Sequence, residues 1–237
     1  MEQPILSPNV DWAASRTQFA QRGRTLIRDC LSADDTARAV SLVTGPLPWT
    51  LQYREGGSTK QLSEARLLEF TESEKESFAT RLNATAEQDF QFSYFSCSLA
   101  PSDVSQFIAD HDIHWLVGRM VNELFVDRIR DVVGDPAIRG LTASLTRYDR
   151  GQYLLPHDDT DSRDDRRAAY VLNLSEDWWP DYGGLLQFLD ESRNVTECFT
   201  PHLGSLALFK VPQLHAVSLV AAHAPRSRFA VTGWLVA

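Results

Sequence analysis

The last part of the chain, residues 138–237, is a succession of short extended runs, and this pattern most constrains the fold. The segments are rich in β-branched, aromatic and aliphatic residues and are separated by turn-forming residues. Many short strands with few helical stretches between them are typical of a small sandwich or barrel. In order, the runs are LTASLTRY, AAYVLNL, GLLQFL, VTECFT, SLALFKV, HAVSLV and RFAVTGWLV.

Residues 1–137 mix helical and extended patterns. Ser32 stands three residues before Asp35, an arrangement that caps a helix, so a helix is expected through 37–43. Residues 24–30 and 89–99 read as strands, the second because apolar and polar residues alternate. Further helices are expected at 72–88 and 103–133. In the last of these, the apolar positions are Ile108, Trp115, Leu116, Val121 and Leu124.

These patterns together predict an α+β, mainly β protein whose core is a small sandwich or barrel. We expect the N-terminal helices to pack on one outer face of the sheet. The chain would then be a single domain over 1–237, in which 1–137 supports a β core at 138–237.

Composition narrows the class of partner. Of the 237 residues, 43% are hydrophobic and 23% charged, as in ordinary globular proteins. The net charge of −9 argues against binding nucleic acid, which needs clustered Lys and Arg. The three cysteines form no CxxC unit, and neither a signal peptide nor a run of about 18 apolar residues is visible. We therefore expect a cytoplasmic protein that binds neither nucleic acid nor membrane.

The chemistry is concentrated in the run RYDRGQYLLPHDDT. His157 and Asp159 are two positions apart, so on an extended strand both side chains point to one face. His215 follows in the extended run VPQLHAVSLV. Two imidazoles and one carboxylate on one face suit non-haem Fe(II) and leave coordination positions open. Alternation turns Asp158 away, which favours Asp159 as the carboxylate ligand.

Two further residues fit a cosubstrate of this metal. Arg228 lies in the strand-like run SRFAVTGW, whose neighbours Phe229 and Val231 predict a core strand. An arginine pointing inward there would need an anionic ligand, such as the distal carboxylate of a cosubstrate. Tyr148 fits either a hydrogen bond to that cosubstrate or simple packing. Gly183 and Gly184 precede a strand and indicate a turn, a hairpin or a bulge.

Four motifs in this order resemble the prolyl 4-hydroxylase-like branch of the 2-oxoglutarate oxygenases, notably the prolyl hydroxylases that act on a ribosomal protein. They are RYDRGQYLLPHDDT, RRAAYVLNLSEDWWPDYGGLLQF, LALFKVPQLHAVSLV and SRFAVTGW. The resemblance covers residues 140–237. It implies a double-stranded β-helix, with Fe(II) at His157, Asp159 and His215. It also implies 2-oxoglutarate held by Arg228 and Tyr148, O₂ as the oxidant, and ascorbate as an accessory reductant.

Two features depart from the family. Where the relatives carry a tyrosine that touches 2-oxoglutarate, the run YVLNL places Asn173, whose amide can still donate a hydrogen bond. The ribosomal-protein group also has a second barrel domain, and no such segment follows in this sequence. Because the carboxylate ligand is present, no coordination position is left for a halide, and hydroxylation is favoured over halogenation.

Other residues admit two interpretations each. His111, Asp112 and His114 share a helical stretch and fit a surface helix better than a metal site. His202 and His223 lie in turn-like sequence and are expected to be exposed. Trp178 and Trp179 fit a core cap and a substrate groove equally. The loop 160–167, with Arg163, is predicted to be a solvated segment or a substrate lid.

Three functions follow from these observations. The first is hydroxylation of a prolyl residue in a protein or peptide, which the family resemblance favours. The second is hydroxylation of a free amino acid or metabolite. The third is a non-catalytic β-barrel that keeps a metal for structure, which would not require Arg228.

Overall fold

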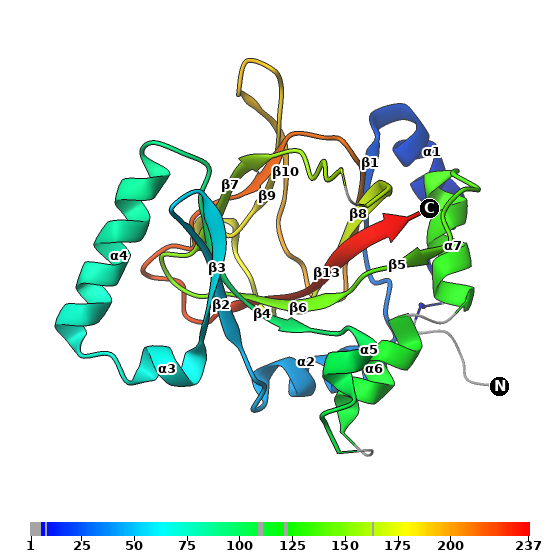
Figure 1. Ribbon diagram of the computed structural model, residues 1–237. Helices are drawn as coiled ribbons and strands as arrows, with labels where there is room; N and C mark the ends of the chain where they lie inside the picture. The colour runs from blue at the N-terminus through cyan, green and yellow to red at the C-terminus, as the bar shows by residue number, and fades with distance from the viewer. Residues whose placement is uncertain (1–5, 8, 109–110, 121–122, 163) are drawn as a thin grey trace.

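A computed structural model describes residues 6–7, 9–108, 111–120, 123–162 and 164–237 (Figure 1). In this part of the chain thirteen strands form one sheet, in which every pairing is antiparallel. The strand order is β1-β11-β8-β13-β6-β4-β7-β12-β9-β10. β2 pairs with β3 and β4, and β5 pairs with β13. The sheet rolls around a central space, with β7, β9 and β10 on one side and β13, β6 and β4 on the other (Figure 1).

The elements follow in this order: α1 (Trp12–Arg22), β1 (Arg24–Ile27), α2 (Ala33–Thr44), β2 (Thr50–Glu55), β3 (Ser58–Ser63), α3 (Glu64–Leu68), α4 (Glu72–Ala86), β4 (Phe92–Ser98), α5 (Pro101–Val104), α6 (Asp112–Met120), α7 (Glu123–Val133), β5 (Gly140–Leu141), β6 (Ser144–Tyr148), β7 (Tyr153–His157), β8 (Arg166–Asn173), the 3-10 turn η1 (Pro180–Tyr182), β9 (Leu186–Leu189), β10 (Val195–Phe199), β11 (Leu206–Lys210), β12 (His215–Val217) and β13 (Arg228–Val236).

The helix starts follow the local chemistry of the sequence. Ser32 caps α2, because its Oγ accepts the N–H of Asp35 at 3.1 Å, as the spacing predicted. Thr71 and Glu74 form a full capping box that opens α4. The single helical stretch expected at 103–133 is instead three helices, α5, α6 and α7. Ile108 and Leu124 are 76% and 53% exposed, so neither belongs to the core, and Val121 lies outside the described residues.

Both faces of β8 are buried, which explains its continuous apolar run. Tyr170 and Leu172 point outward into the large core that the helices cover. Ala169 and Val171 point inward, into a smaller core with Phe188 and other residues of the rolled sheet. The outer core receives Phe19 (α1), Ala39 (α2), Ile113 (α6) and Phe125 (α7). The helices therefore pack on the outer face of this sheet, as the sequence predicted, and α3 and α4 lie beside the β2–β3 hairpin (Figure 1).

The two ends of the strand order meet through side chains. Arg24 of β1 donates from Nε to Glu197 of β10 at 2.5 Å, and its guanidinium lies over the ring of Phe188 in β9. The sheet is thus nearly closed into a barrel. At the entry to β9, Gly183 has φ 69°, and a Cβ there would lie 1.9 Å from the carbonyl oxygen of Leu219. Only glycine allows this close approach.

Within the described ranges, no helix is both long enough and apolar enough to cross a membrane.

Candidate active site

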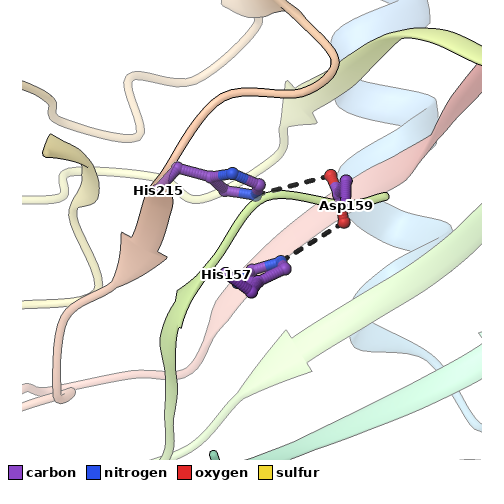
Figure 2. A group of neighbouring side chains, drawn as sticks. All are labelled: His157, Asp159 and His215. Atoms are coloured by element: carbon purple, nitrogen blue, oxygen red, sulfur yellow. Dashed lines mark ion pairs between the residues drawn. The ribbon is translucent and has the colours of Figure 1, made fainter. Parts of the chain in front are cut away.

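Three side chains meet at one end of the rolled sheet. His157 ends β7 and His215 begins β12, and the two are partners in the antiparallel register. Their ring centroids are 4.1 Å apart. Asp159 lies between them, with Oδ1 3.3 Å from Nε2 of His157 and Oδ2 3.5 Å from Nε2 of His215 (Figure 2). One ligand atom from each residue lies within 4.8 Å of the others, a spacing that can hold a metal ion.

The route by which Asp159 reaches this cluster differs from the prediction. From the sequence, His157 and Asp159 were predicted to lie on one face of an extended strand. In the structure the strand ends at His157, and Asp159 has the left-handed φ of 63°. Asp158 is exposed and accepts the N–H of Thr160 at 3.0 Å. This short turn, rather than strand alternation, directs the carboxylate of Asp159 toward the two histidines.

Hydrogen bonds orient both imidazoles. Nδ1 of His157 lies 3.0 Å from the carbonyl oxygen of Leu155, and Nδ1 of His215 lies 2.8 Å from that of Gln213. A carbonyl can only accept, so each Nδ1 carries the proton and donates it. The lone pair of each Nε2 is then free for a metal, which is the usual arrangement of histidine ligands.

The local electrostatics favours the protonation states that a metal requires. Burial, followed by the neighbouring His157, lowers the pKa of His215 to about 4, so this ring is neutral at pH 7. Burial acts to raise the pKa of Asp159, but the neighbouring His157 and His215 outweigh it and lower the pKa. Neutral imidazoles and an ionised carboxylate are the ligand forms of divalent metals.

A buried arginine faces the same cavity from another wall. Arg228 is 2% exposed and begins β13, where its register partner is Tyr148 of β6. Its guanidinium carbon lies 5.2 Å from the centre of the Tyr148 ring. The ring of Tyr94, on β4, stacks on the ring of Tyr148 with a centroid distance of 5.2 Å. Burial lowers the pKa of Arg228. No ion pair reaches it within the described ranges, and its buried Nε has no hydrogen-bond partner.

The triad and Arg228 line one cavity of about 460 Å³. Its walls carry Phe90, Phe92 and Trp234 besides the two tyrosines. The mouth is bordered by residues of the β2–β3 hairpin and of the loop after Asp159. A buried, unpaired cation is unfavourable in a folded protein unless an anion binds beside it. The cavity therefore has the features of a site for a metal and an anionic ligand.

Comparison with known proteins identifies the domain. Residues 143–236, which contain the triad and Arg228, match the family model of the 2OG-Fe(II) oxygenase superfamily. This part of the chain is therefore similar to the oxygenase domain of that superfamily. No curated protein matches the chain. The match supports the predicted enzyme class, a 2-oxoglutarate-dependent dioxygenase, and implies Fe(II), 2-oxoglutarate and O₂ as its cofactors. Ascorbate has no support from the comparisons.

Solved oxygenase structures share the fold over nearly the whole chain. A Pseudomonas putida prolyl-4-hydroxylase has a TM-score of 0.57 at 18% identity, covering 95% of this chain and 99% of that one. A Trichoplax adhaerens prolyl hydroxylase in complex with a hypoxia inducible factor peptide fragment has a TM-score of 0.59 at 17% identity, covering 95% and 90%. The 2-oxoglutarate-dependent epimerase SnoN from nogalamycin biosynthesis has 0.57 at 10% identity, covering 94% and 81%. These likenesses confirm the double-stranded β-helix.

Asn173 is not among the residues that line the cavity. It is buried, and its amide nitrogen donates to Oγ of Ser205 at 3.1 Å. The residues of β8 that face the cavity from the inner side are Ala169 and Val171. They lie four and two residues before Asn173 on the same face of the strand. The prediction that Asn173 faces the cosubstrate is therefore wrong. In the motif YVLNL, the residue that faces the cavity is Val171, two residues before Asn173. Its side chain has no polar group.

The remaining predicted substrate contacts also lie elsewhere. Trp178 is buried, donates from Nε1 to the Gly183 carbonyl at 2.9 Å and packs on Tyr182, so it caps a small core. Trp179 is 62% exposed, and neither tryptophan lines the cavity. Arg163 lies outside the described residues. The loop 160–167 does border the cavity, through Thr160, Asp161 and Arg166.

The other histidines form no second metal cluster among the described residues. Asp112 pairs with Arg38, and His111 accepts the N–H of Ile113, which agrees with the surface-helix interpretation. His223 is exposed, as expected. His202 is half-buried rather than exposed.

Several residues of the cavity wall were not predicted from the sequence, among them Tyr94, Arg166 and Trp234. Period two could have found Trp234, because it lies six residues after Arg228 in the same strand and thus on the same face. Tyr94 alternates with Phe92 in a strand that was predicted. No local pattern marks Arg166, since it lies in a charge-rich run.

Proposed function

We propose that this protein is an Fe(II)- and 2-oxoglutarate-dependent hydroxylase in which His157, Asp159 and His215 hold the metal. One observation carries the proposal. Arg228, a buried cation with no anionic partner among the described residues, lines the same cavity as the cluster of His157, Asp159 and His215. A planar guanidinium matches a carboxylate through two hydrogen bonds, which suits the distal carboxylate of 2-oxoglutarate.

The donor set fits the implied groups. The Nε2 atoms of both histidines and the Asp159 oxygens point at one another, and two nitrogens with one oxygen suit Fe(II) and leave positions open. When bound, Fe(II) and 2-oxoglutarate supply the oxidising power that hydroxylation of a C–H bond requires. The protein contributes binding and orientation.

Two phenols support the proposed anion site. Burial raises the pKa of Tyr148, and burial followed by the charge of Asp159 raises that of Tyr94 to about 12. Both hydroxyls therefore stay protonated and can donate to a carboxylate. Val171 offers no such donor from β8, so Tyr94 on β4 supplies a hydroxyl from a different strand.

The aromatic walls give the third contribution. Phe90 lies 5.5 Å from His157 and Phe92 lies 5.6 Å from Tyr94, measured between ring centroids. Apolar rings beside the metal cluster exclude water from the place where the substrate would react, and they strengthen every electrostatic contact there.

For the substrate we propose a prolyl residue in a peptide or protein. The support is the sequence resemblance to prolyl hydroxylases and the likeness in fold to two enzymes of that name, one of them with a peptide bound. A prolyl residue within a chain has no backbone N–H, so its ring would be held by packing against rings such as Phe90 and Phe92. Trp178 and Trp179 have no part in this proposal.

A small-molecule substrate is the second candidate, because a cavity of about 460 Å³ is in the range of metabolite pockets. The two are separated by mass spectrometry. The enzyme, Fe(II) and 2-oxoglutarate are incubated with a cell extract, and one added oxygen atom is sought on protein proline and on metabolites. Oxygen gain on protein proline supports the prolyl proposal. Gain on a metabolite alone would replace it.

The third function, a non-catalytic metal-binding barrel, makes a different prediction for Arg228. A structural metal site does not require a buried guanidinium. A non-catalytic barrel would also form no succinate from 2-oxoglutarate, even in the wild type. Fe(II)-dependent succinate formation above the buffer control excludes that function.

A further inference from the structure

Arg166 contacts the turn that carries the carboxylate of the metal cluster. Its Nη1 donates to the main-chain carbonyl of Asp159 at 3.2 Å, across seven residues of sequence. Its Nη2 donates to the carboxylates of Asp161 and Asp164, each at 3.2 Å. One guanidinium thus ties the start, the middle and the end of the loop that follows β7.

The same guanidinium is fixed on the barrel wall. Its central carbon lies 3.7 Å from the ring centre of Trp234, on β13, and the Arg166 side chain is 13% exposed. Backbone pairing also places Arg166 opposite Val236 and Trp234 opposite Ala169. The loop is therefore anchored on the strand that carries Arg228 at its other end. Stacking of a guanidinium on an indole has the geometry of a stabilising cation–π contact.

The contact leaves the metal-binding atoms free. Arg166 binds the main-chain oxygen of Asp159, whereas Oδ1 and Oδ2 face Nε2 of the two histidines. A cation bonded to the carboxylate itself would compete with a metal. Asp159 also needs such support, since a left-handed φ costs a residue other than glycine about 1–2 kcal/mol.

We propose that Arg166, stacked on Trp234, is a positioning residue that holds Asp159 in the left-handed conformation required for metal binding. The inference rests on the proposed function of the triad. It assigns to Arg166 a role in metal affinity that is separate from any contact with substrate. Trp234 completes the support, because its indole ring gives the guanidinium of Arg166 a flat face on which to stack.

The neighbouring Arg167 provides a matched control. It lies on the same strand and pairs with Asp165 at 2.7 Å and Asp135 at 3.7 Å, both away from the cavity. Arg167→Ala therefore removes an arginine and its ion pairs from the same strand without touching Asp159. The comparison separates loss of the Asp159 contact from loss of charge or strand stability.

The test is Mn(II) binding to the metal-free protein, followed by the electron paramagnetic resonance signal of free Mn(II). We expect Arg166→Ala to weaken Mn(II) about tenfold to a hundredfold, the usual cost of removing a group that orients a ligand. Arg166→Lys should recover little, because an ammonium lacks the fork and the flat stacking face. Arg167→Ala should bind like the wild type. Thermal unfolding of each metal-free variant shows that it is folded.

Equal Mn(II) affinity in Arg166→Ala and the wild type would overturn the inference, as would equal weakening by Arg166→Ala and Arg167→Ala. Full rescue by Arg166→Lys would also overturn it, because charge alone would then suffice. If the wild type binds no Mn(II), or binds it equally after His215→Ala, the proposed function fails and this inference fails with it.

Discussion

The two ends of the cavity are built in different ways. At the anion end, Arg228 and Tyr148 are register partners on adjacent paired strands, and both are buried. At the metal end, His157 and His215 are likewise register partners, but the third ligand is in a turn beyond the strand. The residues of the anion end thus lie on paired strands, whereas the metal end also depends on side chains that fix a loop.

This difference has an energetic consequence. Strand pairing fixes the position of Arg228 in the absence of a ligand. Its buried, unpaired charge therefore destabilises the ligand-free protein. At the metal end, the unfavourable free energy lies in the left-handed backbone of Asp159. Contacts such as that of Arg166 offset it. Substitutions at the two ends should therefore affect binding and stability differently.

The largest effect is expected at the metal end. His157→Ala, Asp159→Ala and His215→Ala each remove one of three ligands and should abolish Fe(II)-dependent formation of succinate from 2-oxoglutarate. Asp158→Ala is the matched control, because Asp158 is exposed and its carboxylate accepts the N–H of Thr160 in the loop. Retained activity in Asp159→Ala together with loss in Asp158→Ala would show that the carboxylate ligand was assigned to the wrong residue.

At the anion end, Arg228→Ala should weaken 2-oxoglutarate binding by about a hundredfold or more, from a lost pairing of about 3–5 kcal/mol. The same change should not lower the thermal stability of the ligand-free protein, because it removes an unpaired buried charge. Calorimetric titration of 2-oxoglutarate in the presence of Mn(II) measures the affinity. Thermal unfolding measures the stability of the ligand-free protein.

Arg226→Ala is the control for this pair of measurements. Arg226 lies two residues earlier, is partly exposed and contacts the carbonyl of Glu176 and the carboxylate of Asp177. If its loss weakens 2-oxoglutarate as much as the loss of Arg228, the anion site has been placed on the wrong arginine.

A smaller effect is expected from the two stacked phenols. Tyr148→Phe and Tyr94→Phe each remove one hydroxyl donor and keep the ring, which should weaken 2-oxoglutarate about tenfold, the cost of one hydrogen bond to a charged group. Tyr182→Phe, which changes a phenol packed on Trp178 outside the cavity lining, should have no effect on affinity. Unchanged affinity in Tyr94→Phe would limit the anion site to Arg228 and Tyr148.

A further prediction concerns the pH dependence of stability. The pKa of His215 is about 4 in the folded chain, against a usual value of 6.5, so the unfolded chain binds more protons between these values. Stability of the metal-free protein should therefore rise as pH increases from about 4 to 6.5 and fall in the reverse direction. Thermal unfolding measured across this range should show the slope, and His215→Gln should flatten it. An identical slope in the variant would assign the effect to other groups.

Much of the fold follows from local patterns. The alternation in 89–99, the cap at Ser32 and the short extended runs after residue 138 are local signals, and each corresponds to an element of the structure. The helical stretch 103–133 was divided wrongly, because its apolar residues do not show where one helix ends and another begins. Exposed Leu124 shows that an apolar residue on a helix need not face the core, and Ile108 lies between α5 and α6 rather than in a helix.

The sequence by itself determined which chemical groups are available: two histidines, one aspartate and an arginine in strand-like runs whose order resembles an oxygenase family. Only the tertiary structure decided how they meet. Asp159 enters the cluster through a left-handed turn supported by Arg166, and Tyr94 reaches the cavity from a strand distant in sequence. Val171, rather than Asn173, has the facing position on β8. Local propensity is encoded over a few residues, whereas the register and twist that set these contacts arise from pairing of strands far apart in the chain.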